Sequence, residues 1–111
     1  MNVEKRKPNM TIIVPVFNEE QTLTELFNHL DKLKAKLTNL DISFLFINDG
    51  STDNSLKILE GLSNKFKYVK IISFTRNFGH QAAIAAGINF CNDDYAVIID
   101  ADLQDPPNEI E

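Results

Sequence analysis

The chain has 111 residues, enough for one domain with a core of its own but too few for several domains. Its 43% apolar content indicates a folded protein, and its formal net charge of −5 argues against nonspecific nucleic-acid binding, which requires a basic face. The single cysteine, Cys91, excludes an internal disulfide and a zinc cluster.

The beginning of the chain is polar. We expect residues 1–9 to form a tail and residues 10–111 to form the functional part of the molecule. The first residues lack the apolar core of a signal peptide, and no apolar run approaches the roughly 20 residues needed to cross a bilayer. We therefore expect the chain as written to be soluble.

The first strand is predicted over residues 10–17, MTIIVPVF, with Pro15 tolerated because it lies near the strand end. Asn18 is expected to cap the helix that follows, with Gln21 completing an approximate capping box. Apolar residues then recur at helical spacing from Leu23 to Leu37, which predicts an amphipathic helix.

A second strand and helix follow. The nearly unbroken apolar run ISFLFI within residues 41–48 is typical of a strand covered on both faces. Gly50 supplies a turn, and Ser51 or Thr52 is expected to cap a helix whose apolar positions run from Leu56 to Phe66.

A third strand is predicted over residues 69–74 and an alanine-rich helix over residues 81–90. The small residues of that helix would let it approach the sheet closely, and we interpret them as packing residues. His29, between polar positions of the first helix, is expected on the surface.

The fourth strand is predicted over residues 95–99, YAVII, and its composition favours burial on both faces. Asp100 and Asp102 follow it, and residues two apart in an extended chain point the same way. Two carboxylates so close repel unless a cation lies between them. Mg²⁺ or Mn²⁺ binds one or two carboxylates together with substrate phosphates, so it is the simplest answer. For an isolated D-x-D, two loop carboxylates that merely face water remain the alternative.

The order β-α-β-α-β-α-β predicts an α/β fold with a parallel sheet between helical layers, an α/β/α arrangement. In such sheets ligands bind beyond the carboxyl ends of the strands. Polar residues follow all four predicted strands and should converge on one rim: Asn18 and Glu19, Asp49, Arg76 and Asn77, and Asp100 and Asp102.

The loop after the first strand contains no glycine, which disfavours a dinucleotide or P-loop phosphate cradle. Glu19 and Asp49 could instead accept hydrogen bonds from ribose hydroxyls or base N–H groups. Arg76 suits phosphate oxygens, although a surface salt bridge is nearly as good an interpretation. The alternative is that Asn18 and Asp53 cap helices and that Asp49 binds its own turn.

Four stretches of the chain resemble the family 2 glycosyltransferases of the GT-A fold. More narrowly, they resemble the enzymes that move a hexose from a nucleotide sugar to a polyprenyl or dolichyl phosphate. The stretches are IIVPVFNEE at 12–20, INDGSTD at 47–53, TRNFGHQAAIAAG at 75–87 and DADLQDPP at 100–107. The resemblance covers nearly the whole chain after residue 10 and implies the Rossmann-like, nucleotide-binding half of a GT-A fold.

The resemblance also implies roles for individual residues. Those expected around the nucleotide are Pro15, Phe17, Glu19 and Asp49. From their places on the predicted rim, and apart from the resemblance, Arg76 and Asp100 are also expected to contact the nucleotide. Those expected to hold Mg²⁺ or Mn²⁺ are Asp100, Asp102 and Gln104. No catalytic residue is assigned, because the family's acceptor-side carboxylate is expected beyond Glu111.

The implied reaction is inverting transfer of a hexose from a UDP- or GDP-linked donor to a lipid phosphate. In the full-length enzyme it would take place at the cytoplasmic face of a membrane reached through segments absent here. It would serve the synthesis of cell-envelope glycans, and homo-oligomerisation stays open. We expect the 111 residues alone to bind nucleotide and metal but to turn over slowly or not at all.

Three alternatives remain from the residues. A Mg²⁺-binding receiver domain would need a fifth strand ending in lysine. A D-x-D phosphatase would carry its motif after the first strand, whereas here the motif follows the fourth. A noncatalytic nucleotide-binding module is the third.

Overall fold

The computed structural model describes residues 7–101. Strands and helices alternate along this part of the chain, as the sequence predicts. They are β1 (Asn9–Val16), α1 (Leu23–Lys36), β2 (Asp41–Asp49), α2 (Ser55–Lys65), β3 (Val69–Phe74), α3 (His80–Phe90) and β4 (Tyr95–Ile98). None of the helices in this range is long and apolar enough to cross a bilayer.

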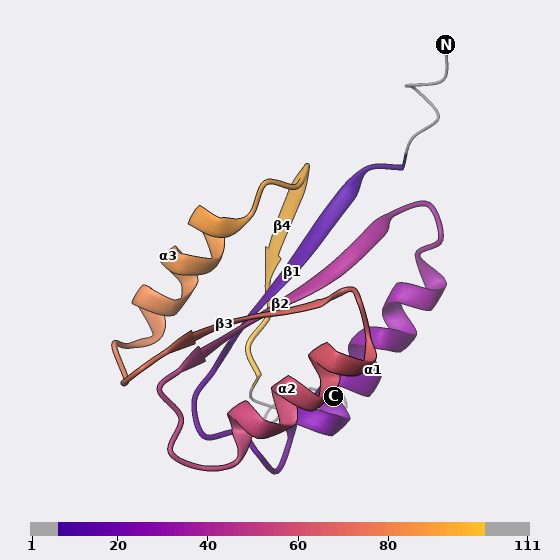
Figure 1. Cartoon of the computed structure of the whole chain (residues 1–111). Coiled ribbons are helices and arrows are strands. Elements are labelled where there is room, and N and C mark those ends of the chain that lie inside the picture. The colour runs from indigo at the N-terminus through magenta and orange to yellow at the C-terminus, as the bar shows by residue number, and fades with distance from the viewer. Residues whose placement is uncertain (1–6, 102–111) are drawn as a thin grey trace, which may run out of the picture.

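The strands form one parallel sheet in the order β3-β2-β1-β4. The chain builds outward from β1 to β2 and β3, and then returns to the other side of β1 to add β4 (Figure 1). The strand order therefore reverses between β1 and β4, the point at which open α/β sheets form their ligand crevice. All the carboxyl ends meet at the same edge of the sheet.

Helices cover both faces, which confirms the predicted layers. In Figure 1, α1 and α2 lie on one face of the sheet and α3 lies on the other. β1 supplies alternate residues to the two sides: Ile12 and Val14 join the core under α1 and α2, and Ile13 joins the core under α3. This alternation follows from the two-residue period of an extended chain.

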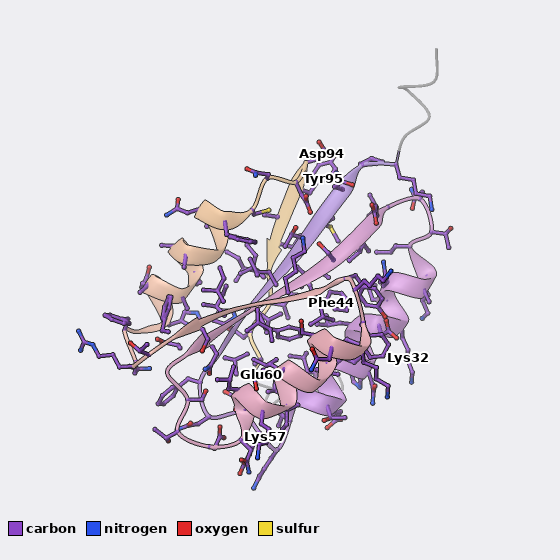
Figure 2. All side chains as sticks on the ribbon, in the orientation of Figure 1. Lys32, Phe44, Lys57, Glu60, Asp94 and Tyr95 are labelled. Atoms are coloured by element: carbon purple, nitrogen blue, oxygen red, sulfur yellow. The ribbon has the colours of Figure 1, made fainter. Side chains whose placement is uncertain are left out.

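The core under α1 and α2 is aromatic. Phe44 of β2 is fully buried and meets Phe27 of α1 edge to face, with 5.8 Å between ring centroids. Figure 2 shows Phe44 inside the molecule, whereas Lys57 and Glu60 extend from the outer side of α2. Burying a side chain of this size stabilises the fold by about 1.5–3 kcal/mol, so these aromatic contacts hold the sheet against α1.

α3 packs very closely on the sheet, as its small residues predict. A Cβ atom built on Gly87 would lie 2.6 Å from Cγ2 of Ile13, and Ala83 is completely buried. The absence of a side chain at Gly87 is therefore what lets α3 reach β1.

The expectation that the fourth strand is buried on both faces is wrong. Tyr95, Val97 and Ile98 are 55%, 39% and 42% exposed. The physical reason is that β4 lies at the sheet edge, where within residues 7–101 it pairs with β1 alone, while α3 packs on β1 and β2. Figure 2 shows Tyr95 and Asp94 where β4 begins.

The predictions that Asn18 caps the first helix and that Ser51 or Thr52 caps the second are also wrong. Oδ1 of Asp53 does accept a hydrogen bond from the N–H of Ser55, the first residue of α2, at 2.9 Å. α1 begins after Thr22 and α2 after Asn54, and neither cap residue makes a side-chain cap hydrogen bond. Asn18 instead adopts a left-handed conformation, with φ of 53°. Its Oδ1 accepts hydrogen bonds from the backbone N–H groups of Thr52, at 2.8 Å, and Asp53, at 3.3 Å. Asn18 thus ties the loop after β1 to the loop after β2.

Candidate functional site

A pocket of about 420 Å³ opens at the carboxyl edge of the sheet, where the strand order reverses between β1 and β4. Its lining residues come from the ends of all four strands, or from the loops that follow them. They are Pro15, Val16, Phe17, Glu19, Asp49, Asn77, Gly79, His80, Asp100 and Ala101. The predicted convergence on one rim is confirmed for Glu19, Asp49, Asn77 and Asp100.

Asp49 ends β2 and is only 3% exposed. Its Oδ1 accepts a hydrogen bond from the backbone N–H of Phe78 at 2.8 Å. Its Oδ2 accepts hydrogen bonds from the N–H of Gly79 and from the side-chain amide of Asn77, both at 3.0 Å. The carboxylate therefore binds the loop after β3 rather than its own turn, and it fixes that loop at the pocket.

The backbone confirms how closely these two loops meet. Gly50 has φ of +69°, and a Cβ built on it would lie 2.1 Å from the carbonyl carbon of Arg76 and 2.3 Å from the nitrogen of Asn77. No larger residue fits there without a shift of the backbone. The backbones of the loops after β2 and β3 are therefore packed directly against each other.

The loop after β1 is fastened to the start of α2. The N–H of Glu19 donates to Oγ of the fully buried Ser55, and the N–H of Glu20 donates to Oδ2 of Asp53. Burial raises the pKa of Asp53, but hydrogen bonds from the side chain and backbone of Ser55 and from the backbone of Glu20 outweigh it, and the net pKa lies below its ordinary value. These bonds hold the backbone from which the Glu19 side chain reaches the pocket.

One wall of the pocket is apolar. Pro15, Val16 and Phe17 line it, and Phe17 is 44% exposed. Exposing an aromatic ring to water is unfavourable, and a ligand that covers the ring removes this cost. The ring also offers a flat surface on which a ligand can stack. This wall suits a ring-shaped group.

Other lining residues of the pocket are polar and exposed. Asp100 comes just after β4, and His80 is the first residue of α3. The Nε2 atom of His80 lies 3.5 Å from Oδ1 of Asp100, and the two side chains are 58% and 65% exposed. Sequence reasoning did not select His80, although its position after the third strand, beyond the predicted rim residues, was the signal that could have found it.

The predicted metal ligands can be tested only in part, because Asp102 and Gln104 lie outside the described residues. Within residues 7–101, no three histidine, cysteine or acidic side chains form a group that could hold a metal. Asp100 presents an exposed carboxylate to the pocket, which fits a hard cation that shares its coordination with phosphate and water. The described part therefore contributes one fitting ligand and not a complete site.

Arg76 is the predicted site residue that the structure does not bring to the pocket. It is exposed, is not among the lining residues, and holds its guanidinium carbon 4.4 Å from the ring centroid of Phe78. This cation–π contact turns Arg76 toward the ring of a neighbouring loop residue.

Comparisons with known proteins identify the family of the chain. The sequence profile of glycosyl transferase family 2 matches residues 11–111. The chain is 47% identical over 100 residues, 90% of its length, to the uncharacterized glycosyltransferase YkcC of Bacillus subtilis, covering 31% of it. It is 36% identical over 111 residues, 99% of its length, to the undecaprenyl-phosphate 4-deoxy-4-formamido-L-arabinose transferase of Proteus mirabilis, covering 34% of it.

A solved structure shares the fold. The mannosyltransferase PcManGT from Pyrobaculum calidifontis, in complex with GDP-Man and Mn²⁺, superposes with a TM-score of 0.73 at 19% identity, over 91% of this chain and 34% of that one. The chain thus spans about a third of the length of the curated relatives named above. The strand order, the rim pocket and the profile match over residues 11–111 agree, and the chain belongs to glycosyl transferase family 2.

Proposed function

We propose that this chain is the donor-binding part of an enzyme that transfers a hexose from a nucleotide diphosphate sugar to a polyprenyl phosphate. The observation that carries the proposal is the rim pocket, in which Phe17, Glu19, Asp49 and Asp100 come together from three separate strand ends. The relative from Proteus mirabilis, named as an undecaprenyl-phosphate sugar transferase, supports a lipid phosphate as acceptor. Family membership leaves the receiver-domain and phosphatase alternatives without support.

The nucleoside would occupy the side of the pocket nearest β1. The exposed ring of Phe17 and the adjacent Pro15 offer an apolar surface for the base. The Glu19 carboxylate, which also lines the pocket, could accept hydrogen bonds from ribose hydroxyls or from base N–H groups. Either UDP or GDP satisfies these contacts.

Asp49 serves the pocket indirectly. Its carboxylate already accepts three hydrogen bonds from the loop after β3. Its main role in the proposed reaction is therefore to hold Asn77 and Gly79 as a fixed wall, a contribution to pre-organisation rather than to base recognition. Asp49 also lines the pocket, so its direct contact with the nucleotide stays part of the proposal.

The diphosphate would lie on the Asp100 side, with Asp102 and Gln104 as further proposed ligands of Mg²⁺ or Mn²⁺. A divalent cation there supplies charge neutralisation for the leaving diphosphate. Asp100 contributes an exposed carboxylate that is open to a ligand from the pocket. PcManGT, which shares the fold, is in complex with Mn²⁺ and GDP-Man, which is compatible with this assignment.

In the proposed transfer, an oxygen of the lipid phosphate forms a bond to the anomeric carbon while the bond from that carbon to the donor diphosphate breaks. The bonding electrons leave with the diphosphate, and attack from the opposite side inverts the anomeric centre. A phosphate oxygen is already anionic near neutral pH, so it needs little help from a base. Binding of the acceptor is assigned to segments of the full-length enzyme outside this chain.

Calorimetric titration of the chain with UDP and GDP, each with and without Mn²⁺, tests the proposal. We expect one nucleotide to bind more tightly with Mn²⁺. We expect Asp100→Asn and Asp102→Ala each to weaken that binding by about tenfold or more, a loss of about 1.4 kcal/mol. Asp94→Asn is the matched control, because Asp94 is an exposed aspartate at the other end of β4 (Figure 2). The proposal would be refuted if the nucleotide affinity changed neither with Mn²⁺ nor with the substitution at Asp100.

A further inference from the structure

His80 occupies a position that the family match does not explain. It is the first residue of α3, and it lines the rim pocket. Within residues 7–101, the polar partner of its imidazole is Asp100, with 3.5 Å between Nε2 and Oδ1. The side chain is 58% exposed, so packing does not account for this placement.

The backbone that carries His80 is firmly held. Gly79, immediately before it, donates its N–H to Oδ2 of the buried Asp49, and Phe78 donates to Oδ1 of the same carboxylate. Gly50 brings the loop after β2 into direct contact with the same segment. The position of the His80 backbone at the pocket is therefore fixed.

Asp100 lacks comparable support. It follows Ile99, whose N–H donates to the carbonyl of Ile13 at 2.9 Å and ends the pairing with β1. Beyond that bond the polar contact of its carboxylate, within the described part of the chain, is His80. An exposed carboxylate with one neighbour samples several rotamers, and each lost rotamer costs free energy when a ligand must be bound in one of them.

We propose that His80 is a positioning residue for Asp100: an imidazole N–H donates to Oδ1 and thereby orients Oδ2 for the cation and the donor diphosphate. This inference rests on the proposed function, since it concerns the same pocket. The contact of 3.5 Å is longer than most hydrogen bonds, and a small rotation of two exposed side chains shortens it when a ligand arrives. Groups that orient a metal-binding carboxylate in this way contribute about tenfold or more to metal affinity.

The experiment compares His80→Ala with His80→Gln in the 111-residue chain. Glutamine keeps an N–H donor at nearly the position of imidazole Nε2, whereas alanine removes it. The affinity for Mn²⁺ is measured from the electron paramagnetic resonance signal of the free ion, with Mn²⁺ alone and then with added UDP or GDP. We expect His80→Ala to weaken Mn²⁺ binding about tenfold and His80→Gln to restore it to within about threefold.

Two reference variants make the result decisive. His29→Ala is the matched control, because His29 is the chain's other histidine and is exposed on α1. Asp100→Asn reports on the proposed function itself. If Asp100→Asn loses Mn²⁺ while His80→Ala does not, the positioning role is wrong and the proposed function stands. If Asp100→Asn binds Mn²⁺ like the native chain, the metal assignment fails as well.

Two further results would overturn the role of His80. A glutamine variant as weak as the alanine variant does so, because a restored donor should orient Asp100. An equal loss in His29→Ala also does so, since that loss would be unspecific. Thermal unfolding of each variant is recorded alongside, and the difference between alanine and glutamine at position 80 decides the question if both lose the same stability.

Discussion

Two aspartates face the same pocket from strand ends on either side of β1, but they differ in burial and in hydrogen bonding. Asp49 is 3% exposed and accepts three hydrogen bonds from the loop after β3. The side chain of Asp100 is 65% exposed, with a single histidine contact within the described residues. The first carboxylate holds the pocket wall in place, and the second is exposed at the pocket, where we propose that it binds a ligand. A carboxylate at a strand end is therefore a binding candidate only when the protein's own donors leave it free.

The neighbours of each aspartate extend the contrast. On the side of Asp49, Asn18 accepts hydrogen bonds from Thr52 and Asp53, and Asp53 accepts from Ser55 and Glu20. On the side of Asp100, β4 is the exposed edge strand of the sheet that residues 7–101 form. The pocket thus has a rigid half made by β1, β2 and β3 and an open half at β4.

The largest expected effect separates the two aspartates by stability. Asp49→Ala leaves three donors without an acceptor in a buried place, so we expect the free energy of unfolding to fall by about 3 kcal/mol. Asp100→Ala should change it by less than about 0.5 kcal/mol, because the side chain is exposed. Urea unfolding of both variants measures the difference. If the two variants lost equal free energy of unfolding, the distinction between a structural role for Asp49 and a ligand-binding role for Asp100 would be wrong.

A second substitution tests whether the rigid half depends on the contact between loops. In Gly50→Ala the new Cβ would meet the backbone of Arg76 and Asn77 at a positive φ, so we expect a loss of about 2 kcal/mol or more. Gly61→Ala is the control, because a Cβ added at this position of α2 would meet no atom within 4 Å and alanine favours a helix. Chemical denaturation that finds both variants equally stable would show that the two loops do not need this close approach.

The smallest effect concerns Asp53 and pH. Its hydrogen bonds keep its pKa below the ordinary 3.8, so the folded state binds fewer protons than the unfolded state in that range. The stability that Asp53 contributes is complete above about pH 4 and is lost as the pH falls through the folded pKa. We expect the native chain to exceed Asp53→Asn in stability at about pH 7 and the gap to shrink at about pH 3. A gap that widens in acid would contradict the hydrogen-bond explanation.

Much of the site followed from the sequence. Pro15, Phe17, Glu19, Asp49 and Asp100 line the pocket as expected, because the carboxyl ends of parallel strands meet at one edge. Arg76 was misplaced because its guanidinium stacks on Phe78, a contact that strand order does not reveal. His80 was missed because helix periodicity predicts which face of α3 packs on the sheet. It does not predict which residue at the beginning of the helix lines the pocket.

The sequence by itself determined the alternation of strands and helices and most of the residues at the rim. The periods of two and 3.6 residues are local properties of the chain, and alternating strands and helices imply parallel connections. Only the tertiary structure decided which rim carboxylate is already bound and which is open. The partners of Asp49 lie 28 to 30 residues away and those of Asn18 lie 34 and 35 residues away. No local pattern specifies such bonds, because they exist only once the sheet has brought the strand ends together.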